Sequence, residues 1–233
     1  MELVFLKAKQ RLAKEISNKG TTPYPLTKNF TSEHVQVSKT KKGLHNLLKT
    51  LQTQAASGAC LHKGLLKRPL KNESRAMMAD RVASTELLVL DIDGIQMPGS
   101  LTDVRTVAEK IIAQLPECFQ DVSYIAQASA SLGFKKDKVS MHFFFLLDQP
   151  TQPKILKEWF KLLNYETDIL SSQLALSANG QSLSYKLDPS VAENSKIIYI
   201  APPTFKDNIQ DPISADRFVL VERGSVTIDP RPL

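Results

Sequence analysis

The sequence is poor in the residues that mark several classes of protein. Its two cysteines, Cys60 and Cys118, are too few for a disulfide framework or a four-cysteine zinc site, so we expect reduced thiols and no zinc. Nine glycines, 13 prolines and 7% aromatic residues in 233 exclude collagen-like, low-complexity and wholly disordered chains. No run of about 18 apolar residues occurs, and the opening MELVFLKAKQ turns basic too early for a secretory signal. We therefore expect a globular protein of the cytoplasm with no membrane partner.

The net charge of +6 hides a strong difference between two parts of the chain. Residues 1–81 contain 16 Lys and Arg against 5 Asp and Glu, a balance of +11, whereas residues 82–233 contain 14 against 19, a balance of −5. This asymmetry indicates a surface that binds a polyanion, next to a centre rich in carboxylates. We expect a basic N-terminal α/β lobe over 1–81 and a lobe with the candidate catalytic groups over 82–233, in one integrated module.

Hydrophobic periodicity and turn residues predict an α+β protein. Helices are expected over 3–17, 41–57, 101–115 and 155–163, the second stopped by Gly58 and the third capped by Ser100 or Thr102. Strands are expected over 86–93, 121–130, 138–148, 182–188 and 196–201, with a hairpin over 217–229 that turns at Arg223–Gly224. This order of elements predicts a largely antiparallel sheet.

Asp91 and Asp93 end the apolar run ELLVL and precede Gly94. Residues i and i+2 of a strand point to the same face, with Cα atoms roughly 6–7 Å apart, so the two carboxylates project together. Like charges this close repel each other unless a cation lies between them, and hard oxygen ligands favour Mg²⁺ or Mn²⁺. We therefore expect a metal site here, although two acids at a strand end are also found simply solvated.

Ser140 and His142 begin a strongly apolar strand and share one of its faces by the same period. A histidine in such a strand is more often a core residue than a ligand. Lysines precede this one, however, and hydroxyl, imidazole and ammonium groups together are suited to holding a triphosphate. Asp188, before Pro189, is by itself typical of a turn and gains weight only from the other acids.

Together these motifs resemble the signature of the archaeo-eukaryotic primase superfamily, especially the compact primase–polymerase modules of phage and mobile-element replication proteins. The segments that carry the resemblance are LLVLDIDG, SASLGFKKDKVSMHFFFLLDQP and SYKLDPSVAENSKIIYIAPPTF, within residues 60–205. His142 follows Asp93 by 49 residues, and Asp188 follows His142 by 46. The order, spacing and strand context make the set more specific than any one motif.

The resemblance implies a catalytic core with an RRM-like, mostly antiparallel sheet, and a primase or polymerase that joins NTPs or dNTPs on a single-stranded DNA template for replication initiation. Asp91, Asp93 and Asp188 would hold two Mg²⁺ or Mn²⁺ ions, and Ser140 and His142 would contact the phosphates of the nucleotide. Lys136, Lys138 and Lys196 are candidate phosphate cations by position, and Ser129 and Ser131 are candidate hydroxyl contacts. The DNA backbone would lie on the basic segment 63–81, through Lys63, Lys67, Arg68, Lys71 and Arg75.

The chain departs from the family in one respect, because it lacks the ligands of the zinc-binding element that many members insert. It also has no G-x-x-x-x-G-K-[ST] motif, so we expect no P-loop ATPase within it. We expect this segment to be the N-terminal part of a longer replication protein with a helicase domain C-terminal to it, or to work with a helicase in trans.

Three other functions stay open from the sequence. An apolar run followed by DxDG also begins haloacid-dehalogenase-type phosphatases, in which Asp91 would be the nucleophile and Asp93 the acid/base. Three features count against this function: the motif follows 90 residues, Ile95 stands where Thr or Val is expected, and no later paired-acid motif occurs. A non-catalytic DNA-binding replication initiator explains the basic segment but not the three acids. A single-strand nickase needs a second histidine near His142, and the other histidines, His34, His45 and His62, lie far upstream.

Overall fold

The computed structural model describes residues 1–177, 179–213 and 216–230. Its helices are α1 (Lys41–Ala56), α2 (Val104–Ile112), α3 (Pro153–Glu166) and α4 (Asp168–Ser171), with the short 3₁₀ turns η1 (Glu117–Phe119) and η2 (Pro189–Ala192). Its strands are β1 (Glu2–Lys7), β2 (Glu15–Ser17), β3 (Gly20–Thr22), β4 (Asn29–Gln36), β5 (Cys60–His62), β6 (Glu73–Ser74), β7 (Thr85–Gln96), β8 (Tyr124–Ala128), β9 (Lys138–Thr151), β10 (Ala175–Leu176), β11 (Leu183–Ser184), β12 (Ile197–Tyr199), β13 (Thr204–Phe205), β14 (Phe218–Val221) and β15 (Thr227–Ile228). The protein is therefore α+β, as the sequence predicts.

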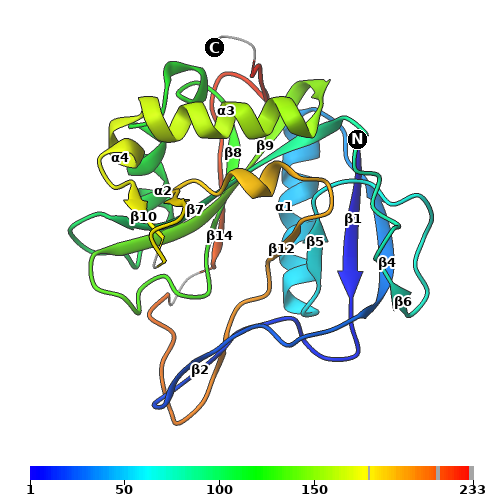
Figure 1. Cartoon of the computed structure of the whole chain (residues 1–233), viewed down its shortest axis with the longest axis horizontal. Coiled ribbons are helices and arrows are strands. Elements are labelled where there is room, and N and C mark those ends of the chain that lie inside the picture. Colours follow the sequence, from blue (N-terminus) through cyan, green and yellow to red (C-terminus); the bar gives the residue numbers. More distant parts are fainter. Residues whose placement is uncertain (178, 214–215, 231–233) are drawn as a thin grey trace.

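Two five-stranded sheets form the body of the molecule (Figure 1). The first sheet has the strand order β12-β5-β1-β4-β6 and is antiparallel. The second is built around β9, which pairs with β7 along one edge and with β8 and then β15 along the other, and β14 lies beyond β8. Among its described pairs, β15 with β9 is the parallel one, so the expectation of a mostly antiparallel sheet is confirmed.

The second sheet is buried on both faces, because its side chains alternate between two cores. Leu88 of β7 and Phe143 of β9 face a core that is covered by α2 and α3. Val89 and Phe144, one residue further along each strand, face another core, which the sheet shares with α1 and with β1 of the first sheet. The two sheets are thus held together by one apolar layer, into which α1 also packs.

Two of the expected helices are confirmed with nearly the expected limits. The leucine stripe predicted over 41–57 forms α1, where Thr40 caps the first turn by accepting a hydrogen bond from the Gly43 amide. The segment 155–163 lies within α3, which begins at Pro153, a residue suited to the first helical turn. None of the described helices is long and apolar enough to cross a membrane.

The helix predicted over 3–17 is wrong. Residues 2–7 form β1, and Leu3 through Leu6 are all buried, because β1 lies inside the first sheet and has a core on each face. A strand covered on both faces gives a continuous apolar run, which periodicity alone does not distinguish from part of a helix. Residues 15–17 form the short strand β2.

The hairpin predicted over 217–229 is also wrong. Its two halves, β14 and β15, do not pair with each other: β14 pairs with β8, and β15 pairs with β9. Of the strand predicted over 182–188, only Leu183–Ser184 is a strand, and an isolated bridge joins Leu187 to Ile92 of β7. This bridge becomes important at the candidate site.

The expected division at residue 81 does not separate the two sheets. β12, from the C-terminal part of the chain, is the outermost strand of the first sheet and pairs with β5. β13 pairs in parallel with β2. Beside this pair the Thr204 hydroxyl donates a hydrogen bond to the carbonyl of Lys14, which is 190 residues earlier in the chain. The basic N-terminal lobe is therefore completed by strands from beyond residue 195.

The cap of α2 gives a test of the fold. Ser100 and Thr102 were the expected caps, but the carboxylate of Asp103 accepts hydrogen bonds from the amides of Arg105 and Thr106. We expect Asp103→Ala to lower the free energy of unfolding by about 1 kcal/mol, because two amides lose their acceptor. Thr102→Ala, next to it, is the control and should change the unfolding energy by less than about 0.5 kcal/mol in urea titrations. Equal losses from the two variants would contradict the assignment of Asp103 as the cap.

Candidate functional site

A cavity of about 220 Å³ opens beside β7, β9 and β12, where the two sheets meet. Its walls combine carboxylates, hydroxyls, cations and aromatic rings from distant parts of the chain. The residues that line it are Lys14, Tyr24, Asp91, Asp93, Ser129, Ser131, Ser140, His142, Asp188, Lys196, Ile197, Ile198 and Tyr199. The three acids, the Ser140–His142 pair, Ser129, Ser131 and Lys196, all predicted as site residues, are thus brought together.

The register of β7 against β9 places the first carboxylates. Asp91 lies opposite His142, and the His142 Nε2 atom is 3.4 Å from Asp91 Oδ1. The register of this pair shifts between Ile92 and Ile95. Over this stretch β7 has two residues, Asp93 and Gly94, where β9 has one, Ser140. Gly94 has φ +65° in this bulge, a left-handed conformation that glycine adopts without a Cβ penalty.

The bulge turns Asp93 toward the hydroxyl of Ser140. Ser140 Oγ donates to Asp93 Oδ1 at 2.5 Å and accepts a hydrogen bond from the Gly94 amide at 2.9 Å. The same-face placement of Asp91 with Asp93, and of Ser140 with His142, was predicted from the two-residue period, and both pairs line the cavity. The contact between the pairs depends on the bulge.

Backbone hydrogen bonds bring Asp188 to the free edge of β7. The Asp188 amide donates to the Asp91 carbonyl at 3.0 Å, and the Asp93 amide donates to the Lys186 carbonyl at 2.8 Å. The Asp188 carboxylate caps η2 by accepting from the Ser190 amide and hydroxyl, each at 2.8 Å. Lys196 Nζ lies 3.2 Å from the same carboxylate.

A buried glutamine orients His142. Gln127 Nε2 donates to the Ile200 carbonyl at 2.7 Å, which leaves Gln127 Oε1 to accept from His142 Nδ1 at 3.0 Å. The Nε2 atom of His142 then faces Asp91, so both ring nitrogens face oxygen atoms. Gln127 is not among the site residues predicted from the sequence. A single polar residue in an otherwise apolar strand could have indicated it, because all residues of β8 are buried.

Asp91 is held in its ionised form by nearby cations. Burial acts to raise the pKa of the Asp91 carboxyl, but the charge and hydrogen bond of His142 and the charges of Lys196 and Lys14 outweigh it, so the pKa lies below its ordinary value. A carboxylate kept ionised in a half-buried wall is available as a hard oxygen ligand or as a counter-charge.

Two tyrosines and a lysine in the cavity wall were not predicted. Tyr24 stacks on Tyr199 with ring centroids 3.7 Å apart and planes 8° from parallel. Lys14 Nζ lies 5.1 Å from the Tyr24 ring centroid. Burial and the charges of Asp91 and Asp93 raise the pKa of the Tyr24 phenol, so this hydroxyl stays protonated beside the carboxylates. No local pattern marks Lys14 or Tyr24, which flank β2 and β3 and meet the rest of the site across long separations in the sequence.

The carboxylates suit a divalent metal in their chemistry but are not gathered into a cage. Within the part of the chain that the structure describes, no group of three His, Cys, Asp or Glu side chains is arranged to hold a metal ion. Asp91, Asp93 and Asp188 do line one cavity, and Mg²⁺ is often held by one or two carboxylates together with substrate phosphates and water. The donor set therefore fits such an ion if a substrate completes it.

Other predicted site residues lie away from the cavity. Lys136 and Lys138 are exposed in and after the loop before β9 and are not among the lining residues. In the basic segment, Lys67 and Lys71 are exposed, while Arg68 is paired with Glu73 at 2.6 Å. Arg75 is half-buried and donates to the Ser195 carbonyl at 2.7 Å, next to Lys196 of the cavity wall.

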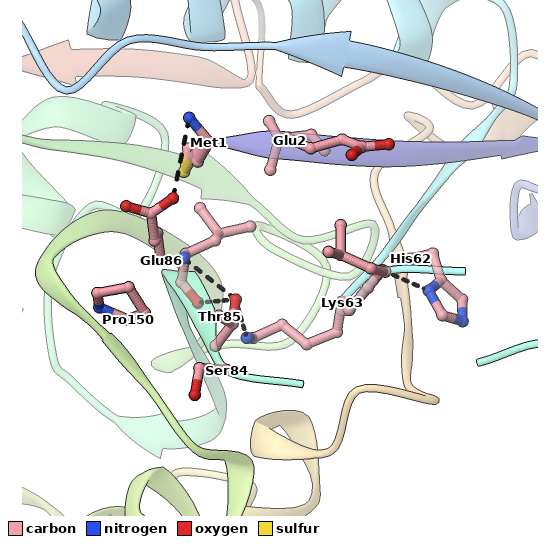
Figure 2. Close-up of a pocket in the computed structure, with 12 residues that line it drawn as sticks. Met1, Glu2, His62, Lys63, Ser84, Thr85, Glu86 and Pro150 are labelled. Atoms are coloured by element: carbon pink, nitrogen blue, oxygen red, sulfur yellow. Dashed lines mark hydrogen bonds and ion pairs between the residues drawn. The ribbon is translucent and has the colours of Figure 1, made fainter. Parts of the chain in front are cut away.

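Lys63, which was predicted to contact the DNA backbone, is enclosed by the fold and only 3% exposed. Figure 2 shows its side chain reaching into a separate pocket of about 150 Å³, where Nζ meets Thr85 Oγ1 at 3.4 Å. Burial lowers the pKa of the Lys63 amine from about 10.5 to about 7. A lysine in a charge cluster is usually solvated, so nothing in the sequence indicates that this one is enclosed.

Comparisons of this chain with protein-family models, with curated proteins and with solved structures find no match.

The buried amine of Lys63 makes stability depend on pH. Between about pH 7 and 10.5 this lysine is protonated in the unfolded chain but not in the folded one, so the free energy of unfolding rises with pH across that window. Below about pH 7 the contribution of Lys63 to that free energy is at its lowest and no longer changes with pH. We expect Lys63→Met to remove this dependence. Its stabilising effect in urea titrations should be on the order of 3 kcal/mol larger at pH 6.5 than at pH 10.

Lys67→Met is the matched control, because Lys67 is exposed and close in sequence. Its effect on unfolding should be the same at both pH values. A Lys63→Met effect that also does not change with pH would show that the amine is not enclosed in solution.

Proposed function

We propose that this protein is a nucleotidyltransferase: a template-dependent primase–polymerase module of the archaeo-eukaryotic type that adds NTPs or dNTPs to a nucleic-acid chain. The observation that carries the proposal is the convergence of Asp91, Asp93 and Asp188 with Ser140, His142 and Lys196 on one cavity. These residues come from three separate segments of the chain. The resemblance of these residues to primase motifs rests on the sequence alone, and their gathering on one cavity is a separate observation that supports the proposal.

The cavity offers complementary groups for a nucleoside triphosphate. His142 Nε2 and Lys196 Nζ are N–H donors that lie beside the carboxylates, where phosphate oxygens can accept from them. Ser129, Ser131 and Ser140 add hydroxyl donors on the same wall. The mixture of cations and carboxyl groups is expected of a site that binds a polyanion together with a metal ion.

Asp91, Asp93 and Asp188 are the residues that would hold Mg²⁺ or Mn²⁺ in this function. When bound, such ions lower the pKa of the attacking 3′-hydroxyl and neutralise charge on the transferred phosphate and on pyrophosphate. The protein's own contribution is to fix the three carboxylates by the β7 bulge and by the backbone bonds to 186–188. Gln127 and Asp91 hold the His142 ring in one orientation.

The alternatives find less support in the cavity. A nickase with two histidines on one metal lacks the second, since His142 is the one histidine among the lining residues and His62 Nδ1 instead bonds to the Gly64 carbonyl. A phosphatase with Asp91 as nucleophile and Asp93 as acid/base leaves open why Asp188 and Lys196 are paired on the same cavity. A non-catalytic initiator does not need three acids to share a cavity.

Removal of one carboxylate tests the reaction class. We expect Asp91→Asn, Asp93→Asn and Asp188→Asn each to lower metal-dependent synthesis on a single-stranded DNA template by roughly 10³-fold, because each removes a negative oxygen ligand without changing side-chain size. Labelled NTPs and dNTPs, with Mg²⁺ or Mn²⁺, are the substrates. The melting temperature of each variant is measured beside the assay to show that it is folded.

Glu166→Gln is the control for loss of a carboxylate, because Glu166 is exposed at the end of α3, away from the lining residues. It should synthesise at the parental rate. Parental synthesis by a folded Asp91→Asn variant would contradict the assignment, and phosphate release without synthesis would favour the phosphatase.

The role of His142 predicts a split between kinetic constants. His142→Ala should raise the KM for the nucleotide by about tenfold, with a smaller fall in kcat, because one donor to the phosphates is lost. His45→Ala, on the exposed face of α1, should leave both constants unchanged. An unchanged KM in His142→Ala would show that this ring does not contact the nucleotide.

A further inference from the structure

Two segments leave the rim of the cavity and meet again outside it. One is the lysine loop, residues 129–138, whose Ser129 and Ser131 line the cavity. The other is the arm, formed by β2, β3 and β13, which Lys14 and Tyr24 of the cavity wall flank in sequence. Figure 1 shows the arm, in blue and orange, projecting from the rest of the molecule.

The loop and the arm touch through two phenylalanines. Phe134 of the lysine loop stacks on Phe205 of β13, with ring centroids 5.7 Å apart and planes 30° from parallel. Phe134 remains 37% exposed, so its ring is supported on one side and open to solvent on another. A supported, exposed aromatic ring is the kind of surface on which a nucleobase stacks with little sequence preference.

Unpaired cations follow directly on this ring. Lys135, Lys136 and Lys138 are exposed, and none of them forms an ion pair with a described acid. By contrast, the basic segment 63–81 has Lys63 buried and Arg68 neutralised by Glu73. The lysine loop therefore carries three exposed cations that no described acid pairs with, and it adjoins Ser129, Ser131 and Ser140 of the cavity wall in sequence.

The base of the loop is anchored at the cavity wall, where Ser129 lies. The Ser129 amide donates to the Ser140 carbonyl at 3.1 Å, and Arg217 Nη1 donates to the Ser129 carbonyl at 2.8 Å. Leu132 is fully buried within the loop. An anchored loop loses less conformational entropy when it binds a ligand than a free one does.

We infer that the lysine loop and the arm bind single-stranded nucleic acid, with a base stacked on Phe134 and the phosphates beside Lys135, Lys136 and Lys138. The inference rests on the proposed function for the identity of the strand, and it moves the strand from the segment 63–81 to this surface. The ligand is thus a flexible single strand whose backbone charge, rather than its sequence, is recognised.

The test measures binding without synthesis. A fluorescently labelled oligodeoxythymidylate is titrated with the full chain in EDTA, without nucleotides, at several salt concentrations. We expect Lys135→Ala/Lys136→Ala/Lys138→Ala to weaken binding at least tenfold and to reduce the slope of log K against log salt by about 2, since each single-strand contact contributes about 0.7.

A matched triple variant on α1, Lys41→Ala/Lys42→Ala/Lys49→Ala, removes the same charge from exposed positions elsewhere. Its affinity should stay within threefold of the parent. Stacking is tested separately: Phe134→Leu should weaken binding 5- to 30-fold, the fold-change for about 1–2 kcal/mol of lost base stacking, whereas Phe134→Tyr should bind within twofold of the parent.

Three outcomes overturn the inference. They are equal losses from the loop and α1 variants, loss confined to Lys67→Ala/Lys71→Ala/Arg81→Ala on the rival segment, and absence of binding by the parent. Because the assay contains no metal or nucleotide, its result is independent of synthesis. A parent that binds through the loop but makes no product would contradict the proposed function alone, whereas a parent that synthesises and loop variants that bind normally would contradict the inference alone.

Discussion

The pairing of β7 with β9 is the constraint on which the candidate site depends. It sets Asp91 opposite His142, and the single extra residue at the Gly94 bulge then turns Asp93 to Ser140. Because side chains alternate along a strand, a slip of one residue would move these groups into the core under α2 and α3. The same strand offers its free edge to 186–188, so Asp188 is placed by backbone bonds to the residues it must join.

The site is also a product of two sheets. The second sheet provides the carboxylates and His142, β12 of the first sheet provides Tyr199, and Lys14 and Tyr24 flank the arm. Each carboxylate meets its own partner: His142 for Asp91, Ser140 for Asp93, Lys196 for Asp188. Each carboxylate therefore has a nearby donor or cation that offsets the repulsion among the three acids. The apolar layer around α1 that joins the sheets is, for this reason, as necessary to the cavity as the residues that line it.

How far the sequence predicted this arrangement follows the range of the interactions. The two-residue period of strands was enough to pair Asp91 with Asp93 and Ser140 with His142, and the leucine stripe was enough for α1. The hydrophobic pattern did not predict the strand at Leu3–Leu6, because burial on both faces removes the alternation. The charge cluster did not predict that Lys63 is enclosed, because Lys63 contacts Thr85 of another strand. The sequence did not predict Lys14 and Tyr24 as site residues, because their part of the chain is held by contacts such as the one between Thr204 and Lys14, which are 190 residues apart.

The stacked rings of Tyr24 and Tyr199 have a consequence for how the cavity is filled. At about 220 Å³ it is smaller than the roughly 300–1,000 Å³ usual for small-molecule sites, and two of its wall residues are pressed against each other. A ligand larger than this space must part the rings or extend past them. For such a ligand, parting the rings would cost free energy, so a change that loosens the stack would tighten binding without touching the ligand.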